Sequence, residues 1–227
     1  MIKCTISIFF VFSFLNMGCG NSKKDNMMEN KKNEINQSLN DKAIEKNSDI
    51  ATMEVAIIST DFGDMVIEFF EGNAPKHVES FKTHAKNRFY DGTIFHRVIP
   101  GFMIQGGDPT TKGENKAAYG TGGFSAKYFG IGDEKIETTW NLPAEFNSIK
   151  HKRGIVSMAR SNSPNSGGSQ FFICAAEVPH LNGKYTVFGK VIEGDEIIDQ
   201  IVNLPRDSRD NPNRRVEMKV RIGKRNK

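Results

Sequence analysis

Cysteine is scarce in this chain of 227 residues, which contains only Cys4, Cys19 and Cys174. No C-x-x-C pair occurs, and the five histidines form neither an H-x-x-x-H nor an H-E-x-x-H spacing. These are spacings in which proteins commonly hold zinc. The sequence therefore predicts no metal site, and nothing in it calls for a cofactor.

A strong charge of either sign is also lacking. The chain has 31 lysine and arginine residues and 27 aspartate and glutamate residues, and the two signs are interspersed. The resulting net charge of +4 is too small to indicate a nucleic acid as partner.

A hydrophobic run long enough to cross a membrane as a helix is missing as well. The N-terminal run from Ile6 to Leu15 has ten residues, whereas a spanning helix needs about 20. Because Lys3 precedes it, the run is typical of the hydrophobic region of a signal peptide, which we assign to residues 1–18.

No A-x-A cleavage site follows this run. Instead, Gly18-Cys19 resembles the processing site of bacterial lipoproteins, in which the cysteine becomes the lipidated first residue. Asn16 departs from that pattern, which has an apolar residue three places before the cysteine. We expect Cys19 to hold the protein on a lipid membrane of the bacterial cell envelope, facing the periplasm or the surface. A secreted form and an uncleaved anchor are the alternatives.

Residues 19–52 are predicted to be a disordered tether that begins with the lipidated cysteine. Between Gly20 and Asp49 there is no aromatic residue, and six lysines balance six acidic residues. Such a segment cannot bury enough apolar surface to become ordered. A weak stripe formed by Ile35, Leu39 and Ala43 leaves a short transient helix as the alternative.

Residues 53–223 show the pattern of one folded domain made mainly of short strands. "EVAIIST" and "DMVIEFF" are strand-like runs joined by the turn signal Asp61-Phe62-Gly63. Two helices are predicted, one in "NAPKHVESFKTHAKNRF" and one at residues 195–202. This composition favours an antiparallel barrel or sandwich. Further short apolar runs cover residues 93–99, 102–106, 154–159, 170–175, 186–191 and 215–222.

Two features of this domain have simple structural interpretations. Cys174 lies in "FFICAA", which predicts a buried strand where the thiol acts as a small hydrophobic group. Basic residues cluster in "RRVEMKVRIGKRNK", residues 214–227, of which 224–227 are assigned as a basic tail. We interpret this stretch as a terminal strand with a frayed end, with contact to anionic lipid headgroups as the alternative.

The residues needed for ordinary covalent catalysis are absent. No G-x-S-x-G motif is present, and Gly120-x-Gly122, within the glycine-rich stretch 110–147, lacks the third glycine of a dinucleotide-binding loop. Asp207 and Asp210 resemble the start of a calcium loop without its glutamate at the twelfth position, so a solvated turn is the better interpretation. What remains is an arginine and glutamines among aromatic residues and methionine, a set suited to a reaction that breaks no covalent bond.

Three segments carry a resemblance to a known family: "FHRVIPGFMIQGGDPT", "GIVSMARSNSPNSGGSQFFICAA" and "LNGKYTVFGKVIEG". Together they resemble the cyclophilins, the peptidyl-prolyl cis-trans isomerases of that family. The resemblance covers roughly residues 54–222. It implies a mainly β fold, a closed eight-stranded antiparallel β-barrel capped by two α-helices, with the site on the outer face of the barrel.

The resemblance also implies catalytic roles for Arg97 and Gln105. Rotation about an X-Pro bond is slow because amide resonance gives a barrier of about 18–20 kcal/mol. By resemblance, Arg97 donates a hydrogen bond to the imide nitrogen and stabilises the twisted state of the X-Pro bond. Gln105 forms hydrogen bonds with the substrate carbonyl and with the arginine. Arginine suits this role because it stays protonated at all relevant pH values.

The substrate-binding residues implied by the resemblance fall into three groups. The walls of the proline pocket are Phe102, Met103, Phe172 and Leu181. The groove for the extended substrate involves Ala159, Arg160 and Gln170, and Gly120 and Thr121 border the neighbouring pocket. His180 and Tyr185 stand where many members of the family carry tryptophan and histidine, respectively. Arg160 occupies an asparagine position and is followed by one extra residue, which shifts the edge of the groove.

We therefore expect a monomeric isomerase that acts on X-Pro bonds of proline-containing polypeptides and assists the folding of exported or surface proteins. The alternative is a chaperone or adhesin module that binds proline-containing segments with little turnover. A peptide isomerisation assay separates the two hypotheses.

Overall fold

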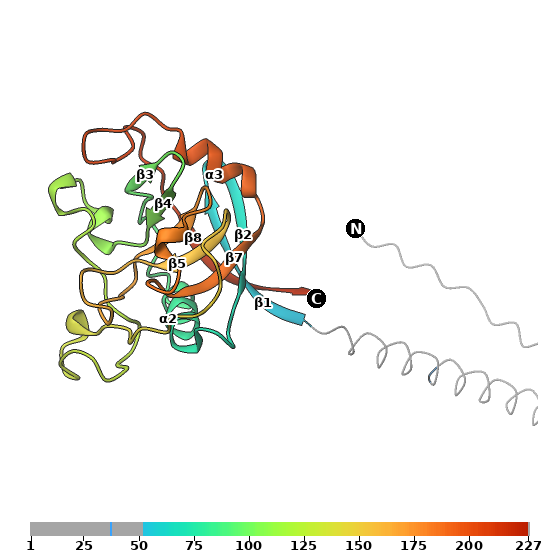
Figure 1. The fold of residues 1–227 in the computed structure, drawn as a ribbon, viewed down its shortest axis with the longest axis vertical. Coiled ribbons are helices and arrows are strands. Elements are labelled where there is room, and N and C mark those ends of the chain that lie inside the picture. The colour runs from blue at the N-terminus through green and yellow to red at the C-terminus, as the bar shows by residue number, and fades with distance from the viewer. Residues whose placement is uncertain (1–36, 38–51, 227) are drawn as a thin grey trace, which may run out of the picture. The chain divides into compact units, whose positions relative to one another are not determined.

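The computed structural model describes residue 37 and residues 52–226, and the fold is that of the second range (Figure 1). The predicted signal peptide, Cys19 and nearly all of the predicted tether lie outside the described residues. Within the part described, no helix combines the length and apolar character that crossing a membrane requires.

The domain is built on one antiparallel sheet of eight strands in the order β3-β4-β6-β5-β7-β2-β1-β8. Neighbouring strands pair antiparallel throughout, as the many short apolar runs of the sequence predict. The strands are β1 (Thr52–Thr60), β2 (Gly63–Phe69), β3 (Arg97–Ile99), β4 (Met103–Gly106), β5 (Ile155–Met158), β6 (Phe171–Cys174), β7 (Val187–Glu193) and β8 (Lys219–Asn226).

The expected closure of the barrel is not confirmed. Strands β3 and β8 are the two edges of the sheet, and no ladder joins them within residues 52–226. Only the segments just before them meet: the backbone N–H of Phe95 donates to Val216 (3.0 Å), and Met218 exchanges hydrogen bonds with Gly92 and Thr93. This pairing ends at Gly92 and Met218, because the segment that precedes Gly92 turns away from β8. From Lys219 onward, the edge of β8 that does not face β1 therefore has no partner strand within residues 52–226.

Two α-helices complete the fold, α2 (Pro75–Lys86) and α3 (Asp195–Val202), and both were predicted from their apolar spacing. Proline stands at the start of α2, where its missing N–H would have no helical partner. Four short 3₁₀ helices lie in the connections: η1 (Pro109–Lys112), η2 (Lys116–Ala118), η3 (Glu137–Thr139) and η4 (Pro179–Leu181).

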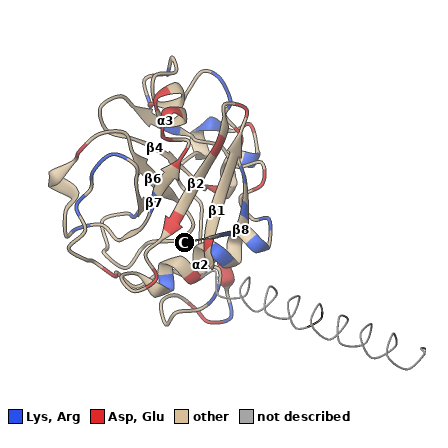
Figure 2. Ribbon diagram, turned by 90° about the vertical axis from the view of Figure 1, so that its right-hand side faces the viewer, with Lys and Arg blue, Asp and Glu red and all other residues tan. Residues whose placement is uncertain are grey.

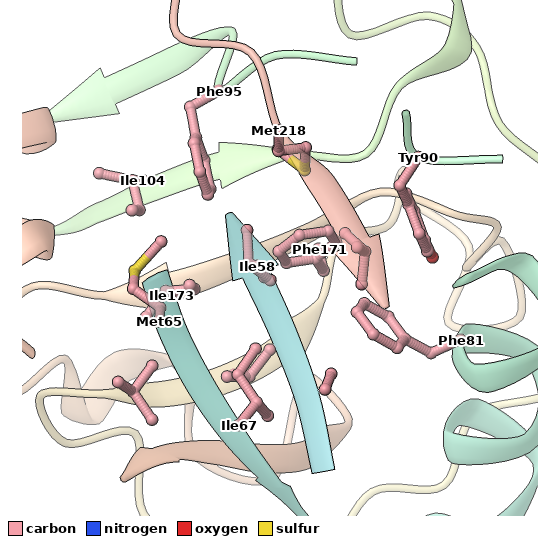
Figure 3. Close-up of a cluster of buried hydrophobic side chains, with 14 of the residues drawn as sticks. Ile58, Met65, Ile67, Phe81, Tyr90, Phe95, Ile104, Phe171, Ile173 and Met218 are labelled. Atoms are coloured by element: carbon pink, nitrogen blue, oxygen red, sulfur yellow. The ribbon is translucent and has the colours of Figure 1, made fainter. Parts of the chain in front are cut away.

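The main core lies inside the curved sheet and under α2 (Figure 3). Phe81 of α2 packs against Tyr90, Phe171 and Phe188, with ring centroids 5.0–5.4 Å apart. Phe171 belongs to this core, whereas Phe172 belongs to a second cluster that includes Met103 and Leu181. The split follows from strand geometry, since adjacent residues of β6 face opposite sides, and it carries the second cluster to the outer face.

Two strands differ in extent from the sequence prediction. β3 has only three residues, although the apolar run begins at residue 93. β8 begins at Lys219 rather than at residue 215 and continues to Asn226. Residues 224–226, expected to form a frayed basic tail, instead pair with residues 52–54 of β1. The terminal strand is therefore confirmed, but its end is not frayed at these residues.

Candidate active site

A tight hairpin sets Arg97 and Gln105 side by side. Pro100-Gly101 forms the turn between β3 and β4, with Gly101 at φ +73° and the N–H of Phe102 donating to Ile99 at 3.0 Å. This is the type II turn that the Pro-Gly pair predicts. The register of the hairpin then makes Arg97 and Gln105 direct cross-strand partners.

The hairpin borders a pocket of about 180 Å³ on the outer face of the sheet. Its floor is built by the second apolar cluster, with Met103 and Phe172 almost fully buried. Phe172 meets Tyr185 edge to face at 5.8 Å and stacks on His151 behind it at 6.0 Å. The pocket is lined by Arg97, Phe102, Met103, Gln105, Ala159, Arg160, Phe172, Leu181 and Tyr185.

His180 is not part of this lining. Its ring lies 5.8 Å from that of Phe102, on the rim formed by η4. It thus adds aromatic surface beside the pocket without forming its wall. Of the residues assigned to the proline pocket by resemblance, the structure brings all four together: Phe102, Met103, Phe172 and Leu181.

Arg97 reaches the pocket from a partly exposed position. Its side chain is 42% exposed, and Nε lies 3.8 Å from Oδ2 of Asp210, whose other oxygen accepts from Arg206. The backbone of Asp210 also accepts a hydrogen bond from the N–H of Val98 at 2.9 Å. The loop around Asp210 therefore flanks the arginine on the side away from β4.

The glutamines form a polar chain from this pocket to a second one. The side-chain amide of Gln105 donates to Gln170 at 2.9 Å, and that of Gln170 donates to the carbonyl of Gly122 at 2.7 Å. Beyond them lies a hollow of about 320 Å³ whose lining includes Gly120, Thr121 and Asn141. The two hollows share Gln105, Ala159 and Arg160, so that together they form one extended groove.

Arg160 is held firmly at the junction of the two hollows. Its guanidinium donates twice to the carbonyl of Lys184, at 3.0 and 2.9 Å, and once to that of Ser161 at 2.9 Å. It also lies over the ring of Tyr185, 4.5 Å from its centroid. Arg160 thus ties the loop at Ser161 to the segment Lys184–Tyr185, which forms one wall of the pocket.

Two residues with structural roles in the site were not assigned from the sequence. Asp108 is fully buried, and its carboxylate accepts from the N–H groups of Thr110 and Gly120, which holds the loop bordering the second hollow. For Asp210 the sequence predicts only a solvated turn, whereas the structure places it against Arg97. The cap that Asp108 places on η1 has a local signal, an aspartate directly before Pro109. Its contact with Gly120, 12 positions away, leaves no such signal.

Two titratable groups beside the hairpin are neutral at neutral pH: His96 directly precedes β3, and Cys174 pairs with Met103 across the sheet. Burial lowers the pKa of His96 to about 4 and raises the pKa of the Cys174 thiol to about 12. No group of three or more potential metal ligands occurs within the described residues. In the lining of this pocket, Arg97 and Arg160 carry a permanent charge.

Comparison with known proteins agrees with this geometry. Residues 55–222 match the family model described as cyclophilin type peptidyl-prolyl cis-trans isomerase. The chain belongs to this family and is an enzyme of the peptidyl-prolyl cis-trans isomerase class. The isomerase hypothesis is thereby confirmed over the binding-module alternative.

Individual relatives cover most of the same region. The chain is 47% identical to peptidyl-prolyl cis-trans isomerase CYP18-1 of Arabidopsis thaliana over 63% of its own length and 78% of the relative. It is 46% identical to the human peptidyl-prolyl cis-trans isomerase-like 3 over 65% of its length and 81% of the relative.

A solved structure shows the same fold. It is a cyclophilin type isomerase of Cryptosporidium parvum, determined in the presence of the dipeptide Ala-Pro. The likeness has a TM-score of 0.64 and 36% identity, and it covers 74% of this chain and 98% of the other.

Proposed function

We propose that Arg97 is the catalytic donor and that Gln105 orients it and the substrate. The observation that carries the proposal is the pairing of these two side chains at the mouth of an apolar pocket lined by Met103 and Phe172. A proline ring, which has no hydrogen-bond donor, suits such a pocket. Binding there would place the imide nitrogen next to the guanidinium.

The proposed chemistry is a rotation without covalent change. When the X-Pro bond twists, the nitrogen lone pair leaves conjugation and becomes a hydrogen-bond acceptor. A fixed positive donor stabilises this twisted state more than either planar state, and this difference lowers the barrier. The polar chain through Gln105 and Gln170 supports an extended substrate along the groove, with Ala159 and Arg160 at its edge.

The test of this proposal is a protease-coupled isomerisation assay on an X-Pro peptide. Replacing Arg97 by alanine removes the donor, and we expect kcat/KM to fall by about 10²–10³-fold. Arg97→Lys keeps the charge but loses the planar fork, so it should recover part of the activity. Arg214→Ala, which removes an exposed arginine paired with Asp61, is the matched control. Full activity in Arg97→Ala would contradict the assigned role.

We further propose that the enzyme acts outside the cytoplasm as a lipid-anchored monomer. Support comes from the sequence: the signal-like run, Gly18-Cys19 and a polar tether that would let the domain reach clients near the membrane. Its substrates would then be exported or surface polypeptides whose folding is limited by the slow isomerisation of X-Pro bonds.

Mass spectrometry of the mature protein tests the anchor. We expect residues 1–18 to be removed, so that the mature protein begins with Cys19. This cysteine should carry the added mass of a diacylglyceryl group. Cys19→Ala should abolish the added mass. An intact N-terminus, or cleavage at another position, would contradict the lipoprotein assignment while leaving the isomerase activity untouched.

A further inference from the structure

A groove remote from the catalytic pocket runs along the free edge of β8. It has a volume of about 660 Å³, against about 180 Å³ for the proline pocket. One wall is β8 itself from Lys219 to Lys224, and the other is the end of α2 with the turn that contains Arg88 and Asp91. Figure 2 shows β8 beside β1, with α2 close to its end.

The backbone along this wall has unused hydrogen-bonding capacity. In an extended strand, the N–H and C=O groups of successive residues point to opposite sides. The backbone N–H and C=O groups of Met218 point toward Gly92 and Thr93, with which they form hydrogen bonds. Because the direction alternates along the strand, the N–H and C=O groups of Ile222 and Lys224 point to the same side as those of Met218. Beyond Met218, no backbone hydrogen bond joins this edge to another segment of residues 52–226.

The groove also carries an excess of positive charge. Five basic side chains line it, against the two acidic side chains Glu54 and Asp91. Glu54 is engaged by lysines of α2. By contrast, no ion pair within residues 52–226 involves Arg88, Lys219 or Lys224. An acidic ligand would therefore meet basic groups that are not already neutralised.

From these observations we propose that the edge of β8 binds an extended acidic polypeptide segment as an added antiparallel strand. An unpaired strand edge supplies the main-chain hydrogen bonds of such binding, and the flanking side chains supply its selectivity. A second copy of this chain is a poor occupant, because two β8 edges would bring like charges together. The site is separate from catalysis, since its lining shares no residue with the proline pocket.

The experiment uses the full chain and a short proline-free peptide in which glutamate alternates with valine, labelled with fluorescein. We expect saturable binding by fluorescence anisotropy and slowed amide exchange at residues 220–224. A peptide with lysine in place of glutamate should bind several-fold more weakly. The dipeptide Ala-Pro should not compete, because under the proposed function it binds in the proline pocket.

Two variants at one position separate charge from backbone pairing. Lys224→Gln removes the charge alone and should weaken binding modestly. Lys224→Pro also removes the N–H directed to the groove, which proline permits on an edge strand, and we expect a further loss of about fivefold in affinity. Both variants should keep the wild-type isomerase activity, which reports that the fold is intact.

The proposal fails if the acidic peptide does not bind, or if both variants bind it as tightly as the wild type. It also fails if Ala-Pro displaces the peptide, which would place binding in the catalytic groove. Concentration-dependent dimerisation blocked by Lys224→Pro would assign the edge to a second copy. Protection of residues 220–224 by anionic vesicles alone would assign it to a lipid surface.

Discussion

At the scale of single residues, His96 stands out because it is buried next to Arg97, the proposed donor, yet neither nitrogen of its ring is used in a hydrogen bond. It is 2% exposed, and both nitrogens lack hydrogen-bond partners. Its surroundings include Asp108, Arg97 and the loop at Gly120. Burial lowers the pKa of His96 to about 4 although Asp108 acts to raise it. The ring must therefore gain a proton when the protein unfolds in mild acid.

This property predicts a loss of stability between about pH 6.5 and pH 4. The folded pKa lies below the unfolded value, so the unfolded state binds more protons and stability falls as the pH falls through this window. The contribution amounts to about 3 kcal/mol at most. His96→Phe should remove this part of the pH dependence without leaving a broken hydrogen bond, as measured by urea unfolding at pH 7 and pH 4.5.

His180→Gln, on the exposed rim, is the control for that measurement. It should retain the wild-type loss of stability in acid. If His96→Phe shows the same pH dependence as the wild type, other groups such as the buried His84 account for it.

At the scale of elements, helix α2 depends on a distant carboxylate for its N-terminus. Ala74 precedes the helix and offers no side-chain cap. The carboxylate of Glu145 caps the helix instead. It accepts hydrogen bonds from the backbone N–H groups of Lys76 and His77, and from Nδ1 of the His77 ring at 2.6 Å. Burial acts to raise the pKa of Glu145, but these hydrogen bonds outweigh it and hold the pKa below its usual value.

We expect Glu145→Gln to destabilise the protein by about 1–2 kcal/mol, because it weakens a helix cap and removes the charged partner of a buried histidine. Urea unfolding at pH 7 measures the change. The difference between variant and wild type should shrink as the pH falls and Glu145 becomes protonated. Glu134→Gln, at an exposed position, is the control. An effect as small as that of Glu134→Gln would show that α2 does not depend on this cap.

At the scale of the whole molecule, the activity should be nearly independent of pH between about pH 6 and pH 8. The proposed donor is an arginine, which does not titrate there, and His96 stays neutral. The measurement is kcat/KM across this range at constant ionic strength. A bell-shaped profile would contradict the mechanism and indicate that a histidine takes part in proton transfer.

The sequence by itself determined the elements whose cause is local. The apolar spacing in α2 and α3, the Pro100-Gly101 turn and the alternation through Phe171 and Phe172 all depend on residues a few positions apart. Through the resemblance, the sequence also gave the residues that the structure brings together around the two hollows, with the exception of His180, which lies on the rim. The order and chemistry of these segments therefore sufficed for the family and the pocket.

Only the tertiary structure decided the contacts between distant segments. Asp210 lies 113 positions after Arg97, and Glu145 lies 68 positions after His77, yet each pair is in contact. The unpaired edge of β8 likewise exists because the segment at Gly92 turns away toward Tyr90 and α2. No local pattern encodes such contacts, since they arise only when packing of the apolar core sets the separate segments at fixed positions.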